Sequence, residues 1–314
     1  MIVTVTANPS LDRTVEVTEL RRGEVLRANA TYVHAGGKGV NVSRALVAHG
    51  HPTLSVLCAG GYSGVELLAL LADACVPIAH VPVAEGVRSN LTLAEPDGTV
   101  TKLNEPGPVL SAGEVDALLS AAMDAIQTGT DWVTGCGSLP PGAPVDFYAR
   151  LVDQAHARGA RAAVDSSGDA LAACLSAGPD LIKPNREELA ECAGVEVRTV
   201  AGAVKAADAL RERGACAVLA SLGPDGAVLV DANGAAHAVS APTRPVASTV
   251  GAGDAALAGF LAAGGVGQRA LAEAVAWGAA AVTLAGSRMP TPTDLDRAAV
   301  EVKPTIDPIL LERS

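Results

Sequence analysis

Short apolar runs rich in β-branched residues alternate along the chain with longer stretches rich in Ala and Leu. The short runs are typical of buried strands and the longer stretches of helices with one buried face. Their repeated order predicts an α/β fold with parallel strands and helices on both faces of the sheet. The predicted strands are Ile2–Thr6, Thr53–Cys58, Trp132–Gly135, Ala162–Asp165, Leu181–Lys183 and Cys216–Ser221. The predicted helices are Asn41–Ala48, Gly64–Ala74, Glu114–Ile126, Val145–Arg158, Arg186–Ala193, Val200–Arg213, Ala255–Ala263 and Arg269–Ala285.

Two segments in the first third of the chain interrupt this rhythm with alternating apolar and polar positions. One has a turn containing Gly23, and the other has Pro96-Asp97-Gly98, which is a hairpin signal. The strands predicted on either side of these turns are Arg13–Val17, Val25–Val33, Ser89–Ala94 and Val100–Asn104. We predict that they pair into one small sheet that acts as a lid or a dimerisation surface. A pair of plain surface hairpins is the alternative.

Composition narrows the class of protein. Of the 314 residues, 49% are hydrophobic, which excludes a disordered chain, and the net charge is −11. A protein this acidic is expected to bind nucleic acid or an anionic membrane poorly. No run of about 18 apolar residues is free of charge, and the first strand does not read as a signal peptide. Six scattered cysteines without a C-x-x-C pair suggest a reducing, cytoplasmic environment.

Two glycine-rich loops run directly into predicted helices. The first is Gly36-Gly37-Lys38-Gly39-Val40-Asn41 and the second is Thr249-Val250-Gly251-Ala252-Gly253-Asp254. A helix start offers free amide groups and a positive dipole end, both of which favour an anion. The carboxylate of Asp254 would repel an anion, but it suits a base beside amides that hold developing negative charge. The alternatives are a connection that binds no ligand and an Asp254 that only caps its helix.

Two common nucleotide motifs fit poorly. The P-loop pattern Gly-x-x-x-x-Gly-Lys-[Ser/Thr] is absent from the sequence. Gly251-x-Gly253-x-x-Ala256 matches a loose dinucleotide fingerprint, but Arg244-Pro245 interrupts the segment where a strand should precede it. Glu273, the acidic residue at the right distance, falls inside a helical pattern. A nicotinamide-dependent oxidoreductase is therefore only a distant alternative.

Polar turns follow four of the predicted strands. Strand ends of this kind form the ligand-binding edge of a parallel sheet, so we expect the turns to line one site. They are the turns at residues 137–142, 165–168, 183–188 and 221–226.

The two glycine loops, Gly137-Ser138-Leu139-Pro140-Pro141-Gly142 and Lys183-Pro184-Asn185-x-x-Glu188 occur in the order found in the PfkB, ribokinase-like carbohydrate kinases. The chain resembles that family over essentially its whole length. The opening Thr6-Ala7-Asn8-Pro9-Ser10-Leu11-Asp12 is similar to its hexose-phosphate branch. The resemblance implies a central, mostly parallel sheet flanked by helices, with a small β-sheet lid. The core would comprise residues 1–11, 34–87 and 105–314, and the lid residues 12–33 and 88–104.

The resemblance also implies ATP-dependent phosphorylation of a hexose monophosphate with the help of Mg²⁺. Fructose 1-phosphate, converted to fructose 1,6-bisphosphate, is the expected acceptor; tagatose 6-phosphate and fructose 6-phosphate are the alternatives. A sugar-phosphate sensor that kept the fold is a non-enzymatic alternative. A homodimer formed through the lid is the expected assembly.

Site roles follow from the resemblance position by position. Asp254 matches the catalytic base, and Gly251, Ala252 and Gly253 complete the anion hole with its amide. The residues that match sugar-phosphate contacts are Asp12, Arg27, Gly37, Lys38, Asn41, Arg88, Asn90 and Ser138. Those that match the nucleotide side are Lys183, Asn185, Glu188, Ser221, Gly223 and Gly226, with Glu188 reaching Mg²⁺ through water. Ala255-Ala256 departs from the serine that often follows the base, which puts a secondary contact in doubt.

Three basic residues favour a phosphorylated acceptor. Arg27, Lys38 and Arg88 stand on separate segments that should converge on one pocket. An arginine fork can hold two phosphate oxygens at once. Scattered surface charge is the alternative.

Overall fold

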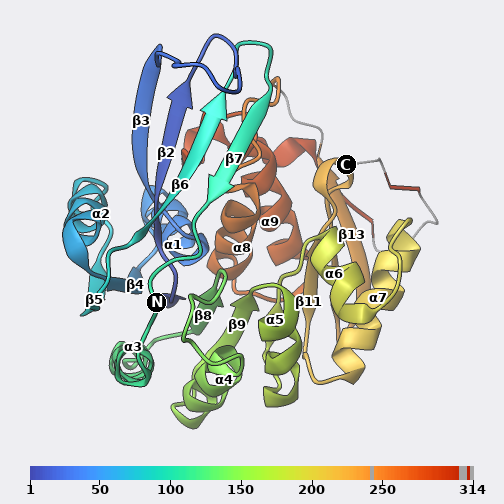
Figure 1. The fold of residues 1–314 in the computed structure, drawn as a ribbon. Coiled ribbons are helices and arrows are strands. Elements are labelled where there is room, and N and C mark those ends of the chain that lie inside the picture. Colours follow the sequence, from blue (N-terminus) through green and yellow to red (C-terminus); the bar gives the residue numbers. More distant parts are fainter. Residues whose placement is uncertain (241–243, 304–309, 312–314) are drawn as a thin grey trace.

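A large, mostly parallel sheet forms the centre of the molecule (Figure 1). The computed structural model describes residues 1–240, 244–303 and 310–311. The strands of this sheet are β1 (Ile2–Thr6), β4 (Thr53–Ala59), β5 (Ile78–Pro82), β8 (Trp132–Cys136), β9 (Arg161–Asp165), β10 (Leu181–Ile182), β11 (Val218–Ser221), β12 (Ala227–Asp231), β13 (Gly234–Ser240) and β14 (Val300–Lys303). Their order across the sheet is β14-β13-β12-β11-β10-β9-β8-β1-β4-β5. Neighbours from β11 to β5 are parallel, whereas β12, β13 and β14 continue the sheet in antiparallel fashion.

Helices cover both faces of this sheet. On one face, apolar side chains pack against α1 (Lys38–Ala48), α8 (Ala252–Ala262) and α9 (Gly267–Ala281). On the other face they pack against α3 (Ala112–Asp124), α4 (Phe147–Ala157), α5 (Gly168–Cys174), α6 (Arg186–Ala193) and α7 (Val200–Glu212). The neighbours Trp132 and Val133 on β8 belong to different faces, as the alternation of side chains along a strand requires.

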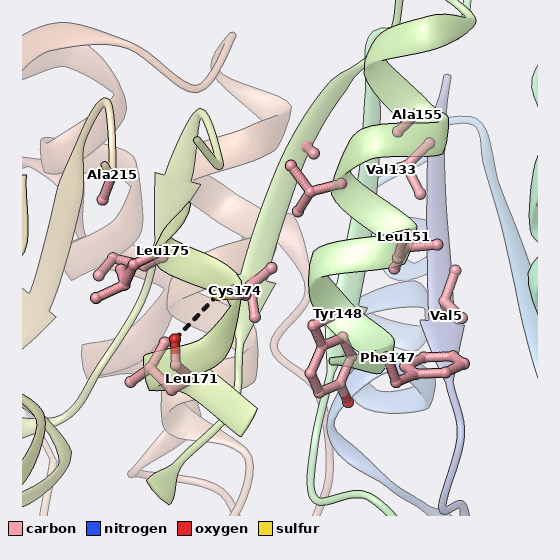
Figure 2. Packing of buried hydrophobic residues seen from close by; sticks show 14 of the residues in the cluster. Val5, Val133, Phe147, Tyr148, Leu151, Ala155, Leu171, Cys174, Leu175 and Ala215 are labelled. Carbon is pink, nitrogen blue, oxygen red and sulfur yellow. Dashed lines mark hydrogen bonds between the residues drawn. The ribbon is translucent and has the colours of Figure 1, made fainter. Parts of the chain in front are cut away.

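The core on the α4 side reaches toward one of the predicted polar turns. Figure 2 shows Phe147, Tyr148 and Leu151 of α4 beside Val133 and Val5 of the sheet. The rings of Phe147 and Tyr148 meet edge to face, with 5.3 Å between centroids. Each such buried side chain contributes about 1.5–3 kcal/mol. Tyr148 also donates a hydrogen bond of 2.8 Å from its hydroxyl to the carbonyl oxygen of Gly137, so the core holds the start of the 137–142 turn.

A separate four-stranded sheet stands above the main sheet (Figure 1). Its strands are β2 (Ser10–Glu16), β3 (Ala30–Gly36), β6 (Arg88–Ala94) and β7 (Val100–Asn104), in the order β3-β2-β6-β7. The register pairs Asp12 with His34 and Asn90, so these three polar residues share one face. At the base of the opposite face, Leu11 and Ala35 pack with apolar residues of α2 (Gly61–Asp73).

The α/β class, the mostly parallel sheet and the second small sheet are confirmed. The strand predicted at Val25–Val33 starts too early, because β3 begins only at Ala30; the turn predicted at Gly23 is present, inside a longer connection that follows Glu16. The connecting segment is too polar to pair as a strand. Instead, the backbone amide of Leu20 donates to the Glu95 carboxylate at 2.8 Å, and Val25 is 90% exposed.

The pattern missed β5, β12, β13, β14 and α5. For β12 and β13 a signal existed, since the dipeptide Asn233-Gly234 is typical of hairpin turns, although the two-residue loop observed is Ala232-Asn233 and Gly234 begins β13. The division into core and lid segments stays a prediction. Residues 241–243, 304–309 and 312–314 of the predicted core segment lie outside the described residues.

All six cysteines are described, and each is a free thiol. Within the described ranges, none of the helices has both the length and the apolar character needed to cross a membrane.

Candidate active site

The second glycine loop ends at the N-terminus of α8. Gly251 caps this helix with φ of 80°, a left-handed conformation that side chains other than glycine rarely adopt. Ala252, Gly253 and Asp254 form the first turn, where amide groups have no carbonyl one turn earlier to bond. The amide of Ala252 makes a long contact of 3.4 Å with Thr249 oxygen. The amides of Gly253 and Asp254 are thus the better placed to bind an anion.

The Asp254 carboxylate is buried, with an exposed fraction of 7%. Burial is the largest of the effects that raise its pKa, from an ordinary value of 3.8 to about 6, and the nearby carboxylate of Asp165 adds to the rise. A hydrogen bond of 2.9 Å from Asn41 Nδ2 to Asp254 Oδ2 acts in the opposite direction. This environment gives a carboxylate that is mainly ionised at neutral pH and still basic enough to accept a proton.

A fully buried carboxylate, Asp165, joins the two lysines of the site. Lys38 Nζ lies 2.7 Å from its Oδ1, and Lys183 Nζ lies 2.9 Å from its Oδ2. Burial alone would raise the pKa of Asp165, but the two ammonium groups outweigh it and hold the pKa below its ordinary value. Burial also opposes the charge on Lys38, and Asp165 and Glu188 overcome it, so the pKa of Lys38 is raised. Lys38 therefore stays charged beside Asp165.

Lys183 lies directly beside the anion hole. A Cβ added to Gly253 would stand 3.3 Å from Lys183 Nζ, so glycine leaves this space to the ammonium group. Asn185 and Glu188 begin α6 with reciprocal hydrogen bonds of 2.8 Å between side chain and backbone amide. The other Glu188 oxygen lies 3.5 Å from Lys38 Nζ. The first glycine loop, the β10 end and α8 therefore meet at one place.

The predicted nucleotide residues lie next to this cluster. Asn185 forms an isolated parallel bridge with Ser221, at the end of β11. Gly223 begins the 3₁₀ turn η2 (Gly223–Asp225), and Gly226 ends it. The structure thus brings Lys183, Asn185 and Ser221 to neighbouring strand ends, with Gly223 and Gly226 in the following turn.

The sugar-side residues of the small sheet form a polar network. Asp12 Oδ1 accepts hydrogen bonds from Ser10 Oγ at 2.7 Å and from Asn90 Nδ2 at 3.0 Å. The carboxylate also lies against the backbone of Gly36, where any side chain would displace it. Gly36 immediately precedes Gly37, so Asp12 and the first glycine loop lie in direct contact.

Arg88 and Ser138 line a cleft of about 540 Å³ between the small sheet and the 137–142 turn. Arg88 donates from Nη1 to Glu105 oxygen at 3.1 Å, and its buried Nε has no partner among the described residues. Ser138 Oγ accepts a hydrogen bond of 3.3 Å from Asn8 Nδ2. A guanidinium group with a free donor beside a hydroxyl is suited to hold a phosphate.

The three basic residues that the sequence placed in one pocket lie in three different settings. Arg27 is exposed in the connection between β2 and β3, beyond the end of these strands that is far from Gly36. The seven residues of β3 place it roughly 20 Å or more from the base of the small sheet. Lys38 is engaged by Asp165 and Glu188. Of the three, only Arg88 lines the cleft, so a single chain does not bring them together.

Sequence reasoning gave no role to two buried residues of the site. Asp165 was noted only as part of a polar turn, although a carboxylate at a strand end among predicted lysines was a usable signal. Asn8, which is 3% exposed, bonds both Ser138 and the carbonyl oxygen of Pro106. Asn8 follows β1, and it thereby connects the end of this strand to two residues that line the cleft.

Comparisons with known proteins agree with this geometry. The profile described as pfkB family carbohydrate kinase matches residues 5–294. The 1-phosphofructokinase of Rhodobacter capsulatus is 38% identical, covering 98% of this chain and 99% of that protein. The ATP-dependent 6-phosphofructokinase isozyme 2 of Escherichia coli is 37% identical over 81% and 82%. The crystal structure of phosphofructokinase-2 from Escherichia coli, in complex with substrates and products, superposes with a TM-score of 0.87 at 34% identity, covering 93% and 96%.

Proposed function

Because the chain belongs to the pfkB family of carbohydrate kinases, we propose that it transfers the terminal phosphoryl group of ATP to fructose 1-phosphate. The products are fructose 1,6-bisphosphate and ADP. The observation that carries the proposal is the buried Asp254 at the start of α8, beside a free helix N-terminus and two paired lysines. Similarity to a 1-phosphofructokinase over 98% of the chain supports the choice of acceptor.

Asp254 acts as the general base in this proposal. A sugar hydroxyl is a weak nucleophile, so its proton must leave as the new bond to phosphorus forms. With its pKa raised to about 6, Asp254 is mainly ionised at neutral pH and can take that proton. Asn41 holds one carboxylate oxygen, Oδ2, and leaves Oδ1 for the hydroxyl.

The amides of Gly253 and Asp254 and the ammonium group of Lys183 hold the transferring phosphoryl group. Phosphoryl transfer depends mainly on positioning and on neutralising charge. The Lys183 side chain is 4% exposed and stays fixed by Asp165, so its charge is in place before the substrate arrives. Asp165 binds no substrate in this scheme; it holds the ammonium groups of Lys38 and Lys183 in place.

Mg²⁺ would be bound chiefly by nucleotide phosphates and water. No group of three or more His, Cys, Asp or Glu side chains in the described part of the chain could enclose a metal ion. Glu188 fits a contact through water, because one of its oxygens caps α6 and the other faces Lys38. Mg²⁺ usually keeps several waters and few protein ligands, which agrees with this donor set. When bound, the ion neutralises charge on the phosphates.

The acceptor's own phosphate is assigned to the cleft of Arg88 and Ser138, and its hydroxyl groups to Asp12 and Asn90. The free Nε of Arg88 supports this assignment. Fructose 6-phosphate is the second candidate acceptor, because the Escherichia coli relative at 37% identity is a 6-phosphofructokinase. Tagatose 6-phosphate stays a third alternative.

The small sheet is proposed to pair with that of a second copy, in addition to covering the site. Its register gathers Val15, Leu91, Leu93 and Leu103 on the face opposite Asp12, and Leu103 is 56% exposed. An exposed apolar sheet face favours association. We propose a cytoplasmic location, in keeping with six free thiols.

Phosphorus NMR of the products tests the proposed activity. Wild-type protein with ATP, Mg²⁺ and fructose 1-phosphate should give ADP and fructose 1,6-bisphosphate in equal amounts. Asp254→Asn, treated identically, should give neither. A new phosphate on a carbon other than C6, or consumption of ATP without a sugar bisphosphate, would overturn the proposal.

A further inference from the structure

Arg44 lies one helical turn after Asn41 on α1, and it contacts two parts of the site. Its Nη1 donates to Asn41 Oδ1 at 3.1 Å and to the backbone oxygen of Ala35 at 3.2 Å. Asn41 in turn donates from Nδ2 to Asp254 Oδ2 at 2.9 Å. A chain of hydrogen bonds therefore runs from the end of the lid strand β3, through Arg44 and Asn41, to the proposed base.

This chain fixes which end of the Asn41 amide faces Asp254. An asparagine side chain carries an oxygen that only accepts and a nitrogen that only donates. A guanidinium group only donates, so it can pair with Oδ1 and never with Nδ2. With Oδ1 held by Arg44, the NH₂ group points to the carboxylate. If the amide turned over, two oxygens would face each other in a site where Asn41 is 4% exposed.

The charges around Asp254 come from several elements. Lys38 and Arg44 belong to α1, Lys183 follows β10, and Asp165 ends β9. Arg44 is itself attracted by Asp12 on β2, and it lies close enough to His34 on β3 to disfavour protonation of that ring. Lys38 and Lys183 are both committed to Asp165, whereas Arg44 carries no carboxylate partner at ion-pair distance within the described ranges.

We propose that Arg44 is a positioning residue: it holds the Asn41 amide in the orientation that donates to Asp254 and ties this pair to the lid-strand end at Ala35. Only the expected kinetic effects of this proposal rest on the proposed function. In this proposal the effect of Arg44 passes through Asn41. Losing it should leave the base poorly oriented and more basic, since both a positive charge and a properly aligned donor are lost.

Kinetics of Arg44→Met and Arg44→Lys test the proposal. We expect Arg44→Met to lower kcat about tenfold or more with KM for ATP changed less than about twofold, and to move the acid limb of the pH profile of kcat/KM to higher pH. Arg44→Lys should restore part of both effects. In an Asn41→Ala background, adding Arg44→Met should change kcat little further. Arg150→Met is the matched control, because Arg150 pairs with Asp116 on the surface.

A second measurement needs no substrate and separates this proposal from the proposed function. The difference in unfolding free energy between a protein and its Asp254→Asn variant, followed against pH, reports the pKa of Asp254. In the Arg44→Met background this pH dependence should shift upward by at least about half a unit, and in the Arg44→Lys background, which keeps the positive charge, it should shift by less. An unchanged pH dependence, with kcat lowered only as far as stability is lost, would show that Arg44 is purely structural and overturn the proposal.

Discussion

Single residues of this site are interpretable because burial restricts what they can do. Asp254 sits where Asn41 binds one of its carboxylate oxygens, Oδ2, and the proposed function assigns the other to the sugar hydroxyl. Replacing it with asparagine removes the base and keeps the shape. We expect Asp254→Asn to lower kcat by about 10²–10⁴-fold or more while ATP and sugar phosphate still bind. Calorimetry measures the binding, and retention of more than about a tenth of wild-type kcat would show that Asp254 is not the base.

The same substitution should make the protein more stable at neutral pH. Burial, and then Asp165, raise the pKa of Asp254 from 3.8 to about 6, so the folded state favours the protonated form. This contribution to stability is complete below about pH 3.8 and is lost as the pH rises from 3.8 to about 6. At pH 7, Asp254→Asn should gain about 1–3 kcal/mol in the free energy of unfolding. Urea titrations measure it, with the exposed Asp116→Asn as control; equal stability at pH 7 would contradict a raised pKa.

Activity should follow the opposite trend with pH. Because the base must be ionised to accept a proton, kcat/KM should fall below about pH 6.

Arg88 provides a residue-scale test of the phosphate cleft. Its contact lies on the lid side, away from the nucleotide turn around Gly223. Arg88→Ala should raise KM for the sugar phosphate about 10- to 100-fold, the value of a charged hydrogen bond, and change KM for ATP little. Arg13→Ala is the control, since Arg13 lies on the opposite face of the same sheet and pairs with Glu66. Equal effects on both KM values would place the phosphate elsewhere.

At the scale of elements, the small sheet is the part of the molecule that we expect to move when substrates bind. Its polar face carries Asp12 and Asn90, and it joins the first glycine loop at Gly36. Closure of this sheet over the substrates would exclude water and limit loss of ATP to hydrolysis. Amide hydrogen exchange at residues 13–33 and 89–104 should slow when sugar phosphate and an ATP analogue are both present. Unchanged exchange there, with slowing confined to α8, would mean that these strands are a static surface or a fixed interface.

Sequence patterns predicted these elements unevenly, for physical reasons. The buried parallel strands and the helices between them gave strong signals, because each needs a continuous apolar run or stripe. The second strand of the first hairpin was predicted to start at Val25 and starts at Ala30, since the long connection is held by contacts such as Leu20 with Glu95, far along the chain. Asp165 was missed as a site residue because its partners, too, are separated from it along the chain. Its importance lies in two lysines that only the folded sheet brings within 3 Å.

For the whole molecule, the arrangement explains how a strongly acidic chain can act on two anionic substrates. The chain carries a net charge of −11, and the groups of the site that suit an anion are Arg88, the N-terminus of α8, and Lys38 and Lys183, whose charges are shared with Asp165. Two of these cations are fixed by a buried carboxylate, so the site is assembled before substrates bind. Motifs distant in sequence could be assigned to it because parallel strands bring their carboxyl ends to one edge.

The central claim, a kinase specific for a phosphorylated hexose, is tested most directly by one series of kcat/KM values. Fructose 1-phosphate, fructose 6-phosphate, tagatose 6-phosphate and ribose should be compared side by side with saturating ATP and Mg²⁺. The proposed function predicts that fructose 1-phosphate gives the highest value, and the cleft predicts that ribose is used poorly, because only a phosphorylated sugar can engage Arg88 and Ser138. A higher kcat/KM for ribose than for every sugar phosphate would contradict the phosphate cleft and the account built on it.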